Sequence, residues 1–177
     1  MRRSYYKELQ DMKELADKGI ILDLGCRDAR DSISFNEAGW KNVIVDKDCV
    51  ALSQAVVNLK KGCESHCEDL NKFLETDDRS FDIVIANYVL PFLPDYKKSL
   101  KRIYSKLKEG GIFIGCFFGD RDAWKDSSKL TFHNKEQALK DLSAYKILDF
   151  QEIEESRRLY SGELKDWHIF EFIVKKT

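Results

Sequence analysis

The sequence lacks the apolar run that a membrane-spanning helix needs, because no segment approaches about 20 consecutive apolar residues. Its first residues are too polar for a secretory signal, so we expect a cytoplasmic protein. It also lacks an excess of charge, since 30 Lys and Arg residues stand against 31 Asp and Glu residues. A nearly neutral chain exerts no general attraction on nucleic acid or on an anionic membrane, and neither is expected as a partner.

Cysteine is present, but not in a pattern that predicts cross-links or a metal centre. The 5 cysteines are odd in number and irregularly spaced, which favours reduced thiols in a chain without a signal sequence. Cys63 and Cys67 flank His66 but have no second ligand pair at the spacing of a zinc finger. We therefore predict no metal site.

The G-x-G-x-x-G run of dinucleotide-binding proteins is also missing. That run lets backbone amides approach a pyrophosphate. In its place stands Asp23-Leu24-Gly25-Cys26, with an acid ahead of the glycine. An acid at this point disfavours a pyrophosphate and suits a cationic ligand. A nicotinamide-dependent reductase is therefore a weak interpretation, which a lack of NAD(H) binding would eliminate.

The most informative segment that is present runs from residue 20 to residue 48. It predicts a buried strand at 20–24, a turn at Gly25, a helix, and a second buried strand at 42–45 that ends at Asp46. A carboxylate at the tip of the second strand can accept hydrogen bonds from the two hydroxyls of a ribose. The segment is therefore typical of the first half of a nucleoside-binding α/β unit.

Strands and helices alternate through the rest of the chain. Further strands are predicted at 64–67, 81–86, 112–118, 145–154 and 167–175, and helices at 4–18, 28–38, 48–59, 95–107 and 134–144. This pattern predicts a single α/β domain over 1–177, with a doubly wound, seven-stranded, mostly parallel sheet and an antiparallel C-terminal hairpin. We expect a monomer or a weak homodimer. Whether the N-terminal helix within 1–18 closes over the site as a lid is left open.

The turn after the first strand resembles the first motif, D-x-G-x-G-x-G, of the class I S-adenosylmethionine-dependent methyltransferases. The resemblance extends from about residue 19 to the C-terminus, and it implies S-adenosylmethionine as the cofactor. The two later glycines of the motif fall on Arg27 and Ala29. Glycine is used where the backbone needs positive φ or a close approach to a ligand. We expect Ala29 to be a mild change that needs only helix-compatible geometry, and Arg27 to be a serious one.

The resemblance also assigns residues to the cofactor, at the carboxyl ends of the strands where open parallel sheets bind ligands. The implied cofactor-binding residues are Asp23, Gly25, Cys26, Arg27, Asp46, Lys47, Asp69, Leu70, Asn87 and Tyr88. It places Asp69 at the adenine amine and the Leu70 amide at a ring nitrogen. Asp69 is explained equally well as a helix N-cap, and one residue can do both. For Asp46 the alternative is simple loop solvation.

The segment from Asn87 to Pro94 matches the part of the family that backs the methyl group and shapes the acceptor pocket. Together with Thr131-Phe132 and the aromatic-rich final strand, it most resembles the small tellurite-resistance type of methyltransferase. That resemblance implies a small, soft acceptor, such as a thiol or a selenium or tellurium compound.

Three further residues are candidates for the acceptor pocket. The final strand of the resembled family runs antiparallel, which would bring His168 to the same rim as Arg121 and Trp124. Arg121 and Trp124 suit an anionic acceptor, through a guanidinium fork and an aromatic wall. The alternative for Arg121 is a salt bridge within the loop to a neighbouring aspartate, and the alternative for Trp124 is a hydrophobic plug. His168 shares a strand face with Phe170, and is either a core-edge histidine or a substrate contact or base.

The function expected from these features is methyl transfer by in-line displacement to a small-molecule acceptor. The donor is already activated, so the protein mainly positions the two reactants. A soft thiolate or selenide acceptor needs little help from a general base. The alternative is a methyltransferase-like domain that has lost turnover and serves as a binding or scaffold module, which Arg27 and Ala29 motivate.

Overall fold

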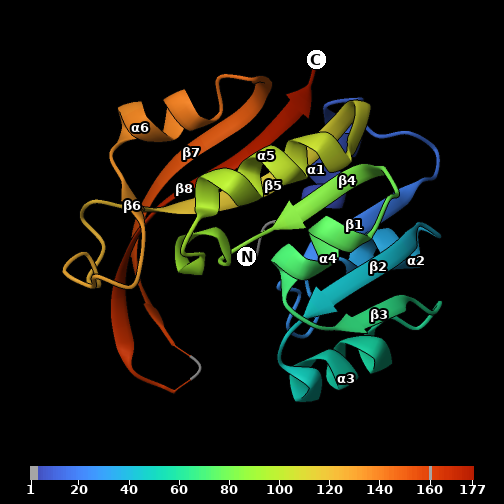
Figure 1. Ribbon diagram of the computed structural model, residues 1–177, viewed down its shortest axis with the longest axis horizontal. Coiled ribbons are helices and arrows are strands. Elements are labelled where there is room, and N and C mark those ends of the chain that lie inside the picture. The colour runs from blue at the N-terminus through green and yellow to red at the C-terminus, as the bar shows by residue number, and fades with distance from the viewer. Residues whose placement is uncertain (1–3, 160) are drawn as a thin grey trace.

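The alternating pattern folds into one mixed sheet with helices on both faces (Figure 1). The computed structural model describes residues 4–159 and 161–177. The strands are β1 Ile20–Leu24, β2 Lys41–Asp46, β3 Glu64–Cys67, β4 Phe81–Ala86, β5 Leu107–Gly119, β6 Phe132–His133, β7 Tyr145–Arg158 and β8 Leu164–Lys176. The helices are α1 Tyr5–Asp11, α2 Ile33–Glu37, α3 Cys49–Asn58, α4 Leu70–Thr76, the 3-10 turn η1 Leu90–Phe92, α5 Tyr96–Lys106 and α6 Lys135–Asp141.

The strand order is β3-β2-β1-β4-β5-β8-β7, and β6 pairs with the end of β5. The strands from β3 to β5 run parallel, whereas β8 is antiparallel to both β5 and β7. The predicted doubly wound α/β fold with an antiparallel hairpin is confirmed. The two-residue β6 makes the sheet eight-stranded instead of seven-stranded, because so short a strand leaves no periodic pattern in the sequence.

Each face of the sheet is covered by its own set of helices. α1 and α2 pack on Ile21, Ile83 and Ile114, while α3 packs on Ile44 of the same face. The opposite face, lined by Leu22, is covered by α4, α5 and α6. In Figure 1, α4 and α5 lie in front of the sheet, with α1 and α2 behind it. The two cores follow from the alternation of side chains along buried strands.

The helices α1 and α2 depart most from the bounds that the sequence predicts. α1 ends at Asp11 instead of continuing to residue 18, since Lys13 adopts a left-handed conformation with φ 58°. α2 begins only at Ile33 instead of residue 28, because Ala29 also has positive φ and cannot belong to a right-handed helix. None of the helices in residues 4–159 and 161–177 combines the length and the apolar character that crossing a membrane requires.

Cys49 and Cys67 form a disulfide, so the expectation of reduced thiols is wrong for these two residues. Cys26, Cys63 and Cys116 carry free thiols. The sequence did not indicate the pair because it is 18 residues apart and belongs to no motif. The fold brings it together, since Cys67 pairs in register with Asp46 at the ends of β3 and β2, and Cys49 follows β2 directly.

Candidate cofactor and acceptor site

The turn after β1 is left-handed at three positions. Gly25, Arg27 and Ala29 have φ values of 65°, 49° and 56°. These are the three positions at which the resembled motif has glycine. A Cβ atom on Gly25 would lie 2.7 Å from a methyl carbon of Val89, so glycine is required there sterically as well. The expectation of helix-compatible geometry at Ala29 is wrong, whereas Arg27 does bear an unfavourable backbone conformation.

Local contacts hold this turn in shape without the two missing glycines. The Arg27 amide donates to Asp46 Oδ2 at 2.8 Å, and the Ala29 amide donates to the Cys26 carbonyl at 2.7 Å. The Ala29 methyl is fully buried beside Leu52 of α3, while the Arg27 side chain is exposed. The turn therefore keeps a glycine-loop backbone, and the Arg27 side chain is exposed to solvent.

Asp46 at the end of β2 is held by amides on both of its oxygens. Oδ2 accepts from Arg27, and Oδ1 accepts from the Asp48 amide at 2.8 Å. Asp48 in turn caps α3 by accepting from the amides of Val50 and Ala51. Each carboxylate oxygen of Asp46 retains a second lone pair. The acid is thereby oriented at the carboxyl edge of the sheet with capacity to accept further hydrogen bonds.

Asp23 is buried in β1 rather than exposed at the rim. Its carboxylate accepts a hydrogen bond from the Ser32 hydroxyl at 2.5 Å. Burial, and secondly the nearby Asp31, raise the pKa of Asp23 to about 8. The acid is therefore largely protonated at neutral pH, and its hydrogen bond ties β1 to the segment that leads into α2.

Asp69 and Leu70 occupy the next turn along this edge, after β3. Asp69 is the N-cap of α4 and accepts from the Asn71 amide at 2.8 Å. Its alternative interpretation as a helix cap is therefore confirmed. Leu70 is buried as the first residue of the helix.

Asn87 and Tyr88 follow β4. The Asn87 side-chain amide donates to the Tyr5 hydroxyl and to Asp31, both at 2.9 Å. Tyr88 has a φ of 54°, and its hydroxyl lies 2.8 Å from an Arg157 nitrogen that donates to it. The first helix thus reaches the rim through Tyr5, because its hydroxyl contacts the residue that directly follows β4.

An aromatic cluster lies beside Tyr88, made of Tyr88, Phe92, Phe118, Trp124 and Trp167. The ring centroid of Trp167 is 5.7 Å from those of both Tyr88 and Trp124, and Phe92 lies 5.7 Å from Phe118. Phe92 and Trp124 also line a cavity of about 690 Å³ that extends to Lys47, next to the predicted ribose acid. Lys47, predicted to lie on the cofactor side, and Trp124, predicted to lie on the acceptor side, therefore border one cavity.

A buried ion pair lies under this cluster. Lys165 Nζ is 2.6 Å from Asp122 Oδ2 and 3.3 Å from the centroid of the Trp167 ring. Asp122 also accepts from the Trp124 amide at 2.9 Å. Burial lowers the pKa of Lys165, and Asp122 opposes that shift. The pair fixes the loop that carries Trp124. The sequence indicated neither role, since Asp122 and Lys165 are far apart and belong to no motif.

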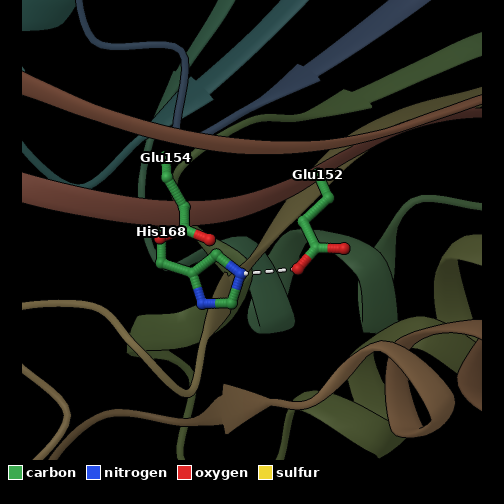
Figure 2. A group of neighbouring side chains, drawn as sticks. All are labelled: Glu152, Glu154 and His168. Carbon is green, nitrogen blue, oxygen red and sulfur yellow. Dashed lines mark hydrogen bonds and ion pairs between the residues drawn. The ribbon is translucent and has the colours of Figure 1, made fainter.

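Arg121 and His168 lie together, but not in the aromatic cluster. His168 Nδ1 accepts from the Arg121 amide at 3.0 Å, and Nε2 lies 3.2 Å from Glu152 (Figure 2). The Arg121 guanidinium pairs with Glu152 and Glu154. His168 shares its strand face with Phe170, as predicted, and strand alternation directs Trp167 to the other face. The structure therefore does not bring Arg121 and His168 together with Trp124 around one pocket.

The ring of His168 also has a packing role. It lies against Gly119, where a Cβ atom would come within 2.1 Å of Nδ1. Glu152, Glu154 and His168 have ligand atoms within 4.8 Å of one another (Figure 2). The guanidinium of Arg121 pairs with both carboxylates, and Lys135 pairs with Glu152 as well. The group is thus an ion-pair network that joins β7, β8 and the loop after β5.

A family model described as a methyltransferase domain matches residues 1–162. The chain belongs to the methyltransferase domain family. Among curated relatives, this methyltransferase domain is 29% identical over 140 residues to a carboxy-S-adenosyl-L-methionine synthase of Campylobacter fetus, a match that covers 72% of this chain and 57% of that protein. The chain thus spans little more than half of the length of that relative.

Solved structures share the fold of this methyltransferase domain. TehB from Haemophilus influenzae superposes with a TM-score of 0.79 at 14% identity, covering 97% of this chain and 62% of that chain. Magnesium protoporphyrin IX methyltransferase from Synechocystis, solved with bound S-adenosylmethionine, superposes with a TM-score of 0.68 at 16% identity, covering 97% and 76%. At these sequence identities, the two superpositions show that the chain shares the fold of those proteins.

Proposed function

We propose that this methyltransferase domain binds S-adenosylmethionine at the carboxyl ends of β1 and β2 and transfers its methyl group to a small molecule. The observation that carries the proposal is the turn at Gly25, Arg27 and Ala29, which keeps three left-handed residues beside Asp46. The cofactor supplies an activated methyl group on a sulfonium, so the protein has to position it against an acceptor.

The proposed cofactor contacts follow the rim. Asp46 would accept from the ribose hydroxyls, and Asp69 with the Leu70 amide would hold the adenine. Gly25, Cys26 and Arg27 form the turn, Lys47 follows the ribose acid, and Asp23 stabilises the turn from within. Asn87 and Tyr88 would border the methyl group. The fit is supported by the second lone pairs of Asp46 and by the concentration of acids at this edge, which suits a cationic ligand.

The proposed acceptor site is the aromatic cluster with Trp124. The three histidines of the described residues are engaged elsewhere: His66 with Glu64, His133 with Asp141, and His168 with Arg121 and Glu152. Burial raises the pKa of Tyr88 above its ordinary value, which makes this phenol a poor base. An acceptor that is already nucleophilic at neutral pH therefore fits best, and we propose a thiol, or a selenium or tellurium compound.

The second candidate is a domain that has lost turnover and acts as a binding module. Its support is the presence of Arg27 and Ala29 where the motif has glycine, because glycine is the residue used where a ligand approaches the backbone closely. The retained left-handed turn counts against this alternative.

The test is calorimetric titration of S-adenosylmethionine into the wild-type protein, Asp46→Ala and Glu109→Ala. Glu109 is an exposed acid at the opposite end of the sheet and serves as the matched control. We expect micromolar binding that weakens at least about tenfold in Asp46→Ala only, since hydrogen bonds to a charged group are removed. Equal affinities in all three proteins would refute the site. Binding without methyl transfer to any thiol, selenite or tellurite would favour the second candidate.

A further inference from the structure

The Cys49–Cys67 disulfide joins the two turns that carry the proposed adenosine contacts. Cys49 begins α3 just after Asp46, and Cys67 ends β3 just before Asp69. Their sulfur atoms lie 4.0 and 3.9 Å from the backbone carbonyl of Lys47, and their Cα atoms are 5.3 Å apart. A covalent link therefore stands between the acid proposed for the ribose and the acid proposed for the adenine.

The second of these turns is anchored on its α4 side, where Leu70 is buried, but is exposed on its β3 side. β3 is an edge strand that pairs only with β2 among the described strands, and three of its four residues are exposed. Asp69 makes its hydrogen bonds to the amides of its own helix. By contrast, Asp46 is fixed by the turn after β1. The disulfide thus adds a covalent tie to the β2–β3 pairing between the β3 turn and the ribose side of the rim.

We propose that Cys49 and Cys67 are a reversible redox pair that controls the affinity of this site for its nucleoside cofactor. In the disulfide form the two turns are held in register, so binding loses less freedom. In the dithiol form the β3 turn separates from the β2 turn, and the cofactor binds more weakly. The identity of the cofactor rests on the proposed function, whereas the ordering of the two turns does not.

The chemistry is two-electron thiol–disulfide exchange. Both cysteines are exposed, so a reductant reaches the bond. A thiolate of an external dithiol attacks one sulfur, and the S–S bond breaks to release the other cysteine as a thiolate that takes a proton. The second thiol of the reductant then displaces the remaining cysteine and closes a cyclic disulfide. Two protein thiols are formed while one dithiol is oxidised.

The experiment compares S-adenosylhomocysteine binding by calorimetry with and without dithiothreitol. The proteins are the wild type, a Cys49→Ser/Cys67→Ser double variant, and Cys63→Ser, whose free thiol makes it the matched control. We expect reduction to weaken binding by the wild type and by Cys63→Ser about five- to tenfold, or roughly 1 to 1.4 kcal/mol. The double variant should bind as weakly as reduced wild type and should not respond to the reductant.

Hydrogen exchange without ligand separates this proposal from the proposed function. We expect the amides of 67–70 to exchange faster after reduction in the wild type, with no change in the double variant. If reduction speeds amide exchange but neither redox state binds the ligand, the cofactor assignment and the control of affinity are both refuted. The ordering of the two turns by the disulfide would still stand. Tight binding that is equal in both states, or alkylation of Cys49 and Cys67 without prior reduction, would overturn the redox proposal alone.

Discussion

The backbone amide of Arg27 donates a 2.8 Å hydrogen bond to the carboxylate of Asp46. This contact links the residue that departs most from the methyltransferase motif to the acid on which the proposed ribose contact depends. It offsets part of the cost of a left-handed arginine, and it orients the acid before any ligand arrives. The turn and the acid are therefore one structural unit.

Replacing Arg27 by glycine should relieve the turn. A left-handed non-glycine residue costs roughly 1–2 kcal/mol, while glycine adds about 1 kcal/mol of unfolded-state freedom. We expect Arg27→Gly to leave the free energy of unfolding unchanged or raised by up to about 1 kcal/mol in urea denaturation. Arg30→Gly, at a neighbouring residue without positive φ, should be destabilising. A loss of more than about 1 kcal/mol in Arg27→Gly would show that its side chain supports the turn.

Asp23 should make stability depend on pH. Its pKa rises from 3.8 in the unfolded chain to about 8 in the folded protein, so the unfolded chain binds fewer protons between these values. Stability due to this group is therefore highest below pH 4 and falls as the pH rises toward 8. In the wild type, the free energy of unfolding should decline by a few kcal/mol across that range, and Asp23→Asn should remove this decline. The measurement is urea unfolding at intervals from pH 5 to 9. If the free energy of unfolding depends on pH in the same way in both proteins, the raised pKa of Asp23 is contradicted.

Breaking the Asp122–Lys165 pair should destabilise the loop that carries Trp124. Both side chains are almost fully buried, so removal of one partner leaves an uncompensated charge. We expect Lys165→Met and Asp122→Asn each to cost about 3–5 kcal/mol in chemical denaturation. The double variant should be less destabilised than the sum of the two. Strict additivity would mean that the two groups do not interact energetically.

Replacing His168 should mainly lower stability, whereas replacing Trp124 should mainly weaken binding of the acceptor. His168→Asn loses a buried contact to Arg121, and we expect about 1–3 kcal/mol lower stability with less than about a tenfold change in kcat. Trp124→Ala opens the aromatic cluster and should chiefly raise KM for the acceptor. The measurement is steady-state methyl transfer combined with thermal unfolding. A hundredfold fall in kcat for well-folded His168→Asn would place the imidazole at the reacting atoms.

Some of the site was predictable from local pattern. The apolar runs of β1, β2 and β4 predicted buried parallel strands, and this placed Asp46 and Asn87 at one edge of the sheet. The start of the helix predicted from residue 134 was equally local, because Asn134 and Gln137 form a capping box within one helical turn. The conformation of Ala29 was not, since alanine by itself favours a right-handed helix and only the surrounding turn imposes a φ of 56°.

The sequence by itself determined the α/β architecture and the acid-bearing rim, because side-chain periodicity and strand ends are local properties. Only the tertiary structure decided which distant residues meet. It joined Cys49 to Cys67 through the register of β2 and β3, buried Lys165 against Asp122, and directed His168 away from Trp124. These outcomes depend on strand register and on the face to which each side chain points, and a shift of one residue would reverse them.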